Sequence, residues 1–151
     1  TFWIDGPGLK YKISNIQAAF ASGQLDRINN LILMKRRIFE WYKEFLRKNK
    51  HIILVEESQN CYSNYWMNSI HIINNEGKKR DKLINYLKKN NIDSRPVFSP
   101  ISEYPIWNKS SKINKTAKLI GYSSLNLPSG TSLTKNEVKY ICKKINLFFN
   151  L

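Results

Sequence analysis

The pattern of apolar and polar positions predicts one long amphipathic helix in the first third of the chain. Ser14 and Gln17 have the spacing of a capping box, in which each side chain accepts a hydrogen bond from the other residue's backbone N–H. From there to about Arg47 the apolar residues step by three and four. They form two neighbouring stripes, Leu31, Met34, Ile38, Trp41 and Phe45 in one and Ile28, Ile32, Phe39, Tyr42 and Leu46 in the other.

Two adjacent stripes give this helix an unusually broad apolar face. A continuous helix of about 34 residues would be about 50 Å long, because each residue adds about 1.5 Å. A domain of this size does not cover such a length, so we expect a second domain or subunit to share the apolar face.

The middle of the chain predicts strands on both sides of a second helix. Residues 52–56, 65–73 and 92–98 are rich in β-branched and aromatic residues, which is typical of strands. Residues 79–90 form the helix between the second and third of them, with Leu83, Ile84 and Leu87 on its inward face.

The last third of the chain predicts two more helices. A short one covers residues 113–120, and a turn follows at residues 127–130. Thr134 and Glu137 form a second capping box at the start of the final helix, whose inward face carries Val138, Ile141, Ile145 and Phe148. The element order predicts an α+β fold, a short sheet with helices packed on it. We expect a leading loop and long helix at residues 1–48 and a small α+β domain at residues 49–151.

Composition and charge bear on whether the chain binds nucleic acid. The chain has 151 residues and a formal net charge of +14, which raises nucleic-acid binding as a possibility. However, its 25 basic residues are scattered without a dense basic segment, and Lys, Asn and Ile are all abundant, as in proteins of AT-rich genomes. Nucleic-acid binding is therefore the less favoured alternative.

The targeting and redox signals are plain. No apolar run approaches the roughly 20 residues of a membrane helix, and Cys61 and Cys142 have neither metal-ligand spacing nor a disulfide framework. We expect a reduced, cytoplasmic protein without membrane contact. The chain starts at Thr1 without a Met, and we expect it to be part of a larger protein.

Two segments concentrate residues that bind anions. Lys10, Tyr11 and Lys12 lie just before a predicted helix N-terminus, and cations beside such a terminus favour a phosphate. Arg95 leaves a predicted strand into a Pro-rich loop with Phe98, and an arginine binds carboxylate or phosphate with two hydrogen bonds. A solvated loop and a structural salt bridge remain the alternatives for these segments.

Other polar residues carry no catalytic pattern. We expect His51 and His71 to be surface or hydrogen-bonded structural residues, and the Glu56-Glu57 pair to be a solvated strand end.

The chain also resembles the DegT/DnrJ/EryC1/StrS family of sugar aminotransferases. The resemblance is specific because several motifs occur in order over nearly the whole chain. These motifs are residues 8–19, Gln24-Leu25, residues 38–42 and 92–98, Pro100, Pro105, residues 126–129 and Leu133-Thr134. The form Lys10-Tyr11-Lys12 is similar in particular to the branch of the family that makes GDP-perosamine.

The resemblance implies the C-terminal part of a type I aminotransferase fold that depends on pyridoxal 5'-phosphate (PLP). The family's Schiff-base lysine lies upstream in a large domain, so the resemblance implies that this chain has no catalytic residue of its own and no metal site. It implies cofactor binding by Lys10 and Lys12, and substrate binding by Tyr11, Arg95 and Phe98. It further implies a homodimer through the long helix, with glutamate and a 4-keto-6-deoxy nucleotide sugar as substrates.

Two positions depart from the family pattern. Most members have Asn and Arg where this chain has Lys10 and Lys12, and a lysine serves an anion as a point charge rather than as a directional donor. Many members have a His where this chain has Ser102-Glu103, which leaves a substrate contact there open. A non-catalytic aminotransferase half that acts as a dimerisation module remains an alternative.

Overall fold

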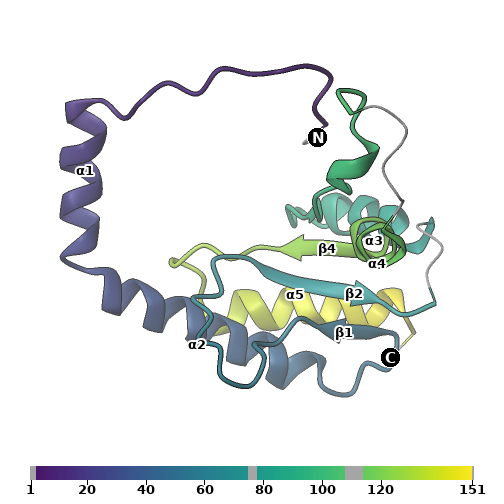
Figure 1. Cartoon of the computed structure of the whole chain (residues 1–151). Helices are drawn as coiled ribbons and strands as arrows, with labels where there is room; N and C mark the ends of the chain where they lie inside the picture. Colours follow the sequence, from purple (N-terminus) through teal and green to yellow (C-terminus); the bar gives the residue numbers. More distant parts are fainter. Residues whose placement is uncertain (1–2, 75–77, 108–113, 151) are drawn as a thin grey trace.

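A four-stranded sheet with helices on one face forms the body of the protein (Figure 1). The computed structural model describes residues 3–74, 78–107 and 114–150. In chain order the elements are α1 (Asn15–Leu25), α2 (Ile28–Leu46), β1 (Ile52–Leu54), β2 (Asn68–Ile72), α3 (Lys78–Lys89), β3 (Arg95–Pro96), the 3-10 helix η1 (Ile101–Glu103), α4 (Lys115–Ser123), β4 (Ser124–Leu127) and α5 (Lys135–Phe148). This architecture confirms the predicted α+β class.

The strand order β1-β2-β4-β3 gives the sheet two different faces, and every neighbouring pair is antiparallel. Alternate residues of a strand point to opposite faces. The inner face carries apolar side chains, namely Ile52, Ile70, Ile72, Leu125 and Leu127, all of which are buried. The outer face carries Ile53, Ser69, His71, Ser124, Asn126 and Arg95, so it is mainly polar.

The core lies between the inner face and the helices α2, α3 and α5. The apolar residues predicted to face inward from α3 and α5 pack in or against this core, whereas Ile28 and Met34 of the apolar face of α2 are exposed. The buried members are Ile38, Tyr42 and Leu46 of α2, Leu83 and Leu87 of α3, and Val138, Ile141 and Ile145 of α5. Burying one large apolar side chain contributes about 1.5–3 kcal/mol. The helical periodicities in the sequence therefore identify the side chains that hold the domain together.

The strand β4 was not predicted, although it lies in the interior of the sheet. Its sequence Ser-Leu-Asn-Leu alternates over only four residues and follows α4 without a loop. Such a short alternation is a weak signal, because strand periodicity is recognised over four to eight residues. β4 is a strand because it pairs with β2 and β3, and its own sequence does not predict it.

The third predicted strand is correspondingly shorter than expected. Of residues 92–98 only Arg95–Pro96 forms a strand. Ile92 lies in the turn that follows α3, where its N–H donates to the carbonyl of Leu87 at 3.0 Å. Asn91 provides the required left-handed residue with φ 58°. The predicted strands at residues 52–56 and 65–73 also shorten, to β1 and β2. The predicted helix at residues 113–120 is α4, and Ile113 lies outside the described residues.

The prediction of one continuous helix from residue 14 to about 47 is wrong. α1 ends at Leu25 and α2 starts at Ile28, and the two run in different directions (Figure 1). Arg27 between them leaves the helical region with φ −112° and ψ 7°. Because α1 has no buried residue, no packing holds it in line with α2. The Ser14 capping box that starts α1 is confirmed, as is the Thr134 capping box of α5.

The N-terminal arm, by which we mean residues 3–25, extends away from the sheet (Figure 1). Its apolar side chains are open to solvent, with Leu9 87%, Ile16 84% and Phe20 72% exposed. At its beginning the arm returns to the domain, where the ring of Trp3 meets that of Tyr104 edge-on at 5.3 Å. No helix in the described part of the chain is long and apolar enough to cross a membrane.

Polar contacts fasten α2 to the turn that follows β4. The hydroxyl of Tyr42 donates to the carbonyl of Pro128 at 2.9 Å, and burial raises the pKa of this phenol. Lys35 donates to the carbonyls of Ser129 and Trp66, and burial lowers the pKa of its ammonium group. The hydroxyl of Ser129 in turn accepts from the backbone N–H of Asn68 at 2.8 Å. The turn is thereby held from α2 and from β2 at once.

A second polar cluster orders the loop between β1 and β2. Arg36 binds the carboxylate of Glu57 through two hydrogen bonds of 2.9 and 2.7 Å, and its guanidinium lies 4.3 Å from the centre of the Tyr62 ring. The bond from Arg36, together with one from the N–H of Ser63, lowers the pKa of Glu57 to about 2. Glu56 pairs with Lys43. The expectation that Glu56-Glu57 is merely a solvated strand end is therefore wrong.

Replacing Tyr42 by Phe tests the connection between α2 and the turn. The variant removes one hydroxyl from the core and leaves the carbonyl of Pro128 without its donor, so we expect the free energy of unfolding to fall by about 1–3 kcal/mol. Tyr140→Phe is the matched control, because that hydroxyl is at the surface and its bond to the carbonyl of Asn90 is long, at 3.5 Å. Chemical denaturation of the three proteins provides the measurement. Equal losses in the two variants would contradict the role given to Tyr42.

Candidate functional site

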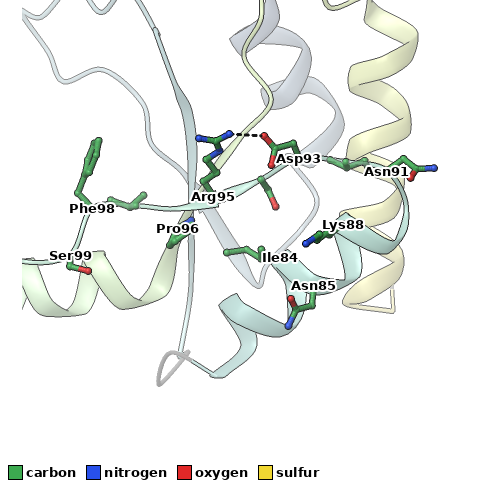
Figure 2. A pocket seen from close by; sticks show the side chains of 12 residues that line it. Ile84, Asn85, Lys88, Asn91, Asp93, Arg95, Pro96, Phe98 and Ser99 are labelled. Carbon is green, nitrogen blue, oxygen red and sulfur yellow. Dashed lines mark hydrogen bonds and ion pairs between the residues drawn. The ribbon is translucent and has the colours of Figure 1, made fainter. Parts of the chain in front are cut away.

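A cavity of about 890 Å³ follows the chain from the end of α3 through β3 and into the next loop (Figure 2). Its lining consists of Ile84, Asn85 and Lys88 of α3 and of residues 91–99. The volume lies in the range of about 300–1,000 Å³ that small-molecule sites occupy. Two of the five predicted binding residues, Arg95 and Phe98, line this cavity.

Arg95 stands on the outer face of the sheet with its charge accessible. Pairing in β3 places it directly opposite Asn126 of β4. Its guanidinium lies 3.4 Å from the carboxylate of Asp93, and both side chains are largely exposed. In Figure 2 the Arg95 side chain rises on one side of the segment, whereas Ile84, Asn85 and Lys88 lie on the other. An exposed ion pair of this kind contributes little, so a ligand anion can replace Asp93 at small cost.

Phe98 is held at the cavity rim by close packing of α4. The residue is 45% exposed, and its backbone lies against Gly121. A Cβ atom on Gly121 would lie 3.0 Å from the carbonyl oxygen of Phe98 and 3.1 Å from Cδ of Pro100. The carbonyl of Gly121 also accepts a buried hydrogen bond of 2.8 Å from Arg80. The absence of a side chain at Gly121 therefore sets how closely α4 approaches the Phe98 loop.

The loop after Phe98 contains an acid that is occupied by structural contacts. The hydroxyl of Tyr122 donates to the carboxylate of Glu103, and this bond raises the pKa of Tyr122. Lys118 pairs with the same carboxylate at 3.4 Å. Glu103 thus ties the loop to α4, at the position where many members of the resembled family have a His. This arrangement leaves Glu103 as a structural residue rather than a free ligand for substrate.

Lys10, Tyr11 and Lys12 lie elsewhere, in the extended part of the arm. All three side chains are exposed, Tyr11 to 85%. The helix α1 begins a few residues later, with Ser14 accepting from the N–H of Gln17. The described chain thus brings Arg95 and Phe98 to one cavity and leaves the three arm residues apart from it. Their binding roles stay predictions.

Three polar residues near the cavity were missed by the sequence analysis. Asn85 and Lys88 are part of the polar face of α3, which carries no pattern that separates a ligand contact from a solvated position. Asn126 belongs to the unpredicted strand β4, so its position opposite Arg95 had no basis in the sequence. Only a prediction that β4 pairs with β3 would have identified Asn126 as the neighbour of Arg95.

Comparison with known sequences places this architecture among sugar aminotransferases. Residues 1–146 match the model of the DegT/DnrJ/EryC1/StrS aminotransferase family. The GDP-perosamine synthase of Escherichia coli O157:H7 is 33% identical over 149 residues, covering 99% of this chain and 40% of that enzyme. The GDP-perosamine synthase of Vibrio cholerae is 32% identical over 151 residues, covering 99% of this chain and 41% of that enzyme. The chain therefore spans about two fifths of the length of these relatives.

A solved structure supports the fold. Helicobacter pylori PseC, an aminotransferase involved in the biosynthesis of pseudoaminic acid, superposes with a TM-score of 0.83 and 17% sequence identity. The match covers 97% of this chain and 40% of that one. At this identity the likeness establishes the shared fold.

Replacing Gly121 by Ala tests the packing behind Phe98. The added methyl group would force α4 and the Phe98 loop apart, and we expect a loss of about 1–3 kcal/mol of stability with shifted signals of Phe98 and Arg80 in an NMR spectrum. Gly23→Ala is the matched control, because Gly23 also lies in a helix but has nothing within 4 Å of the added Cβ. There the higher helix propensity of Ala should leave stability unchanged or raise it by up to about 1 kcal/mol. A neutral Gly121→Ala variant would show that the close approach is not required.

Proposed function

Because the chain belongs to the DegT/DnrJ/EryC1/StrS aminotransferase family, we propose that it is the C-terminal portion of a nucleotide-sugar aminotransferase. The observation that carries the proposal is the family match over residues 1–146. The relatives are more than twice as long as this chain, so we infer that a preceding large domain completes the catalytic unit. In the family that domain holds the Schiff-base lysine.

We further propose that the substrates are glutamate and a GDP-linked 4-keto-6-deoxy sugar. Support comes from the identity of about one third with two GDP-perosamine synthases over 99% of the chain. In this proposal Arg95 binds an anionic group of a substrate, because its guanidinium is exposed and only loosely paired. Phe98 contributes an apolar contact from the rim of the same cavity.

The family depends on PLP, and the arm residues fit one part of this cofactor. When bound, PLP supplies the electron sink for amino transfer. Lys10 and Lys12 carry exposed positive charges on either side of Tyr11, shortly before the N-terminus of α1. Such a cluster favours a phosphate group. We propose that Lys10 and Lys12 contact the cofactor phosphate and that Tyr11 contacts the substrate, on the surface that the arm covers in the complete enzyme.

The arm also supports a proposal for assembly. The exposed apolar residues of α1 have no partner surface in the described domain, whereas Ile38, Tyr42 and Leu46 of α2 are part of the domain core. We therefore place the intersubunit contact at the arm and at the exposed start of α2, within the proposed interdomain segment at residues 1–48. Residues 49–151 form the small domain in this division. A homodimer would cover apolar area that is otherwise open to water.

The activity and the role of Lys10 are tested together in the complete enzyme that contains these 151 residues. We expect amino transfer from glutamate to the GDP-linked 4-keto-6-deoxy sugar, measured by chromatography of the nucleotide sugars. We expect Lys10→Ala to weaken cofactor or substrate binding roughly ten- to a hundred-fold, as for loss of a charge-assisted contact. Lys82→Ala, an exposed lysine on α3, should change neither affinity. An enzyme that transfers no amino group to any such sugar would refute the proposed function, and unchanged affinities in Lys10→Ala would remove only that residue.

Self-association of the 151-residue chain tests the assembly proposal. We expect sedimentation velocity to show dimers or larger species at micromolar concentration. Replacing Ile16 and Phe20 by Ser removes two exposed apolar side chains one helical turn apart and should shift the chain toward monomer. The matched control is Ile53→Ser, which removes an exposed apolar residue from β1 instead. A chain that is monomeric at all concentrations would contradict the proposed interface.

A further inference from the structure

Three polar residues form a row across the outer face of the sheet. Ser69 of β2 lies opposite Asn126 of β4, and Asn126 lies opposite Arg95 of β3. Side chains directly opposite each other in antiparallel strands have their Cβ atoms about 4.5–5.5 Å apart. The row therefore places the amide of Asn126 next to the base of the Arg95 side chain, on the same face of the sheet.

The hydroxyl of Ser69 fixes the orientation of the Asn126 amide. It donates a hydrogen bond of 2.6 Å to Oδ1 of Asn126. With its oxygen engaged on the β2 side, the amide directs its Nδ2 donors away from Ser69. In the described part of the chain, Nδ2 of Asn126 has no hydrogen-bond partner, and the side chain is only half-buried. A donor that is held in place but has no protein acceptor is available to a ligand.

We propose that Asn126 and Arg95 together form a carboxylate-binding site, which takes a carboxylate of the amino donor. The guanidinium offers a planar pair of N–H donors, and the amide adds a neighbouring donor, which suits the two oxygens of a carboxylate. Ser69 is a positioning residue in this site. The choice of ligand rests on the proposed function, in which glutamate supplies the amino group.

The charge of the surroundings favours a carboxylate over a diphosphate. Asp93 lies 3.4 Å from the Arg95 guanidinium and neutralises part of its charge. A ligand that brings one negative charge is repelled less by Asp93 than a diphosphate, which brings at least two. Lys88, the cationic residue of the cavity lining on α3, lies on the opposite side of the segment from Arg95 (Figure 2). A diphosphate therefore has no second cation beside Arg95 in this row.

Titration of the isotopically labelled 151-residue chain with glutamate tests the site by NMR. We expect saturable shifts of the Asn126 side-chain amide and of the Arg95 Nε–H, and about ten-fold weaker binding in Asn126→Ala. Asn126→Asp, which replaces the donor by a second carboxylate, should abolish binding. Asn85→Ala is the matched control, because it removes an exposed asparagine on the other side of the segment (Figure 2) and should leave the affinity unchanged.

The positioning role of Ser69 has its own readout. Ser69→Ala should weaken glutamate binding about three-fold and shift the Asn126 amide signals in the ligand-free protein, because the amide loses its fixed orientation. Ser69→Thr keeps the hydroxyl and should restore both. Amide signals that are identical in wild type and Ser69→Ala would remove Ser69 from the site.

Several outcomes would overturn the inference. One is equal glutamate affinity in wild type and Asn126→Ala. Another is a response of the Asn126 and Arg95 signals to GDP but not to glutamate, which would assign the site to a diphosphate. Loss of glutamate binding in Asn85→Ala alone would place the ligand on the α3 side of the cavity.

The test also separates the site from the proposed function. Glutamate binding through Asn126 in a chain whose complete enzyme transfers no amino group would refute the proposed function and leave the site intact.

Discussion

The insertion of β4 between β2 and β3 determines both the packing of the core and the arrangement of polar residues on the outer face of the sheet. On one side β4 pairs with β2 (Asn68–Ile72), which lies more than fifty residues earlier in the chain. Its apolar residues Leu125 and Leu127 are buried on the inner face, where α2, α3 and α5 pack. Its polar residues Ser124 and Asn126 point to the other face, next to His71 and Ser69. One register thus fixes both the core and the row of donors that ends at Arg95.

The cations of α2 and α3 illustrate how charge is used in this strongly basic chain. Lys35 and Arg36 order backbone and loop segments, the first by donating to two carbonyls and the second by binding Glu57. Arg80 is buried and holds the carbonyl of Gly121. Arg95, in contrast, keeps its charge accessible and has only an exposed, loose partner. The difference between these structural cations and the proposed binding cation Arg95 lies in their partners and not in residue type.

The arm differs from the domain in the way its conformation is determined. The helices α2, α3 and α5 each bury an apolar face against the sheet, whereas α1 buries none. Its described local support consists of the capping box of Ser14 and Gln17 and its internal hydrogen bonds. Most of the stability of a helix in a protein comes from packing of its apolar face. Because α1 has no such packing, the arm leaves its apolar residues Leu9, Ile16 and Phe20, its two lysines and Tyr11 exposed.

The sequence by itself determined the helices of the domain, both capping boxes, the α+β class and the family, because each depends on local spacing or on a contiguous motif. The break between α1 and α2, the strand β4 and the position of Asn126 were decided only by tertiary structure. No proline interrupts residues 14–47 in the sequence, and only the absence of packing on α1 removes the reason for one straight helix. Likewise, Asn126 is an ordinary polar residue until antiparallel pairing places it between Ser69 and Arg95, because strand register arises from contacts between distant segments.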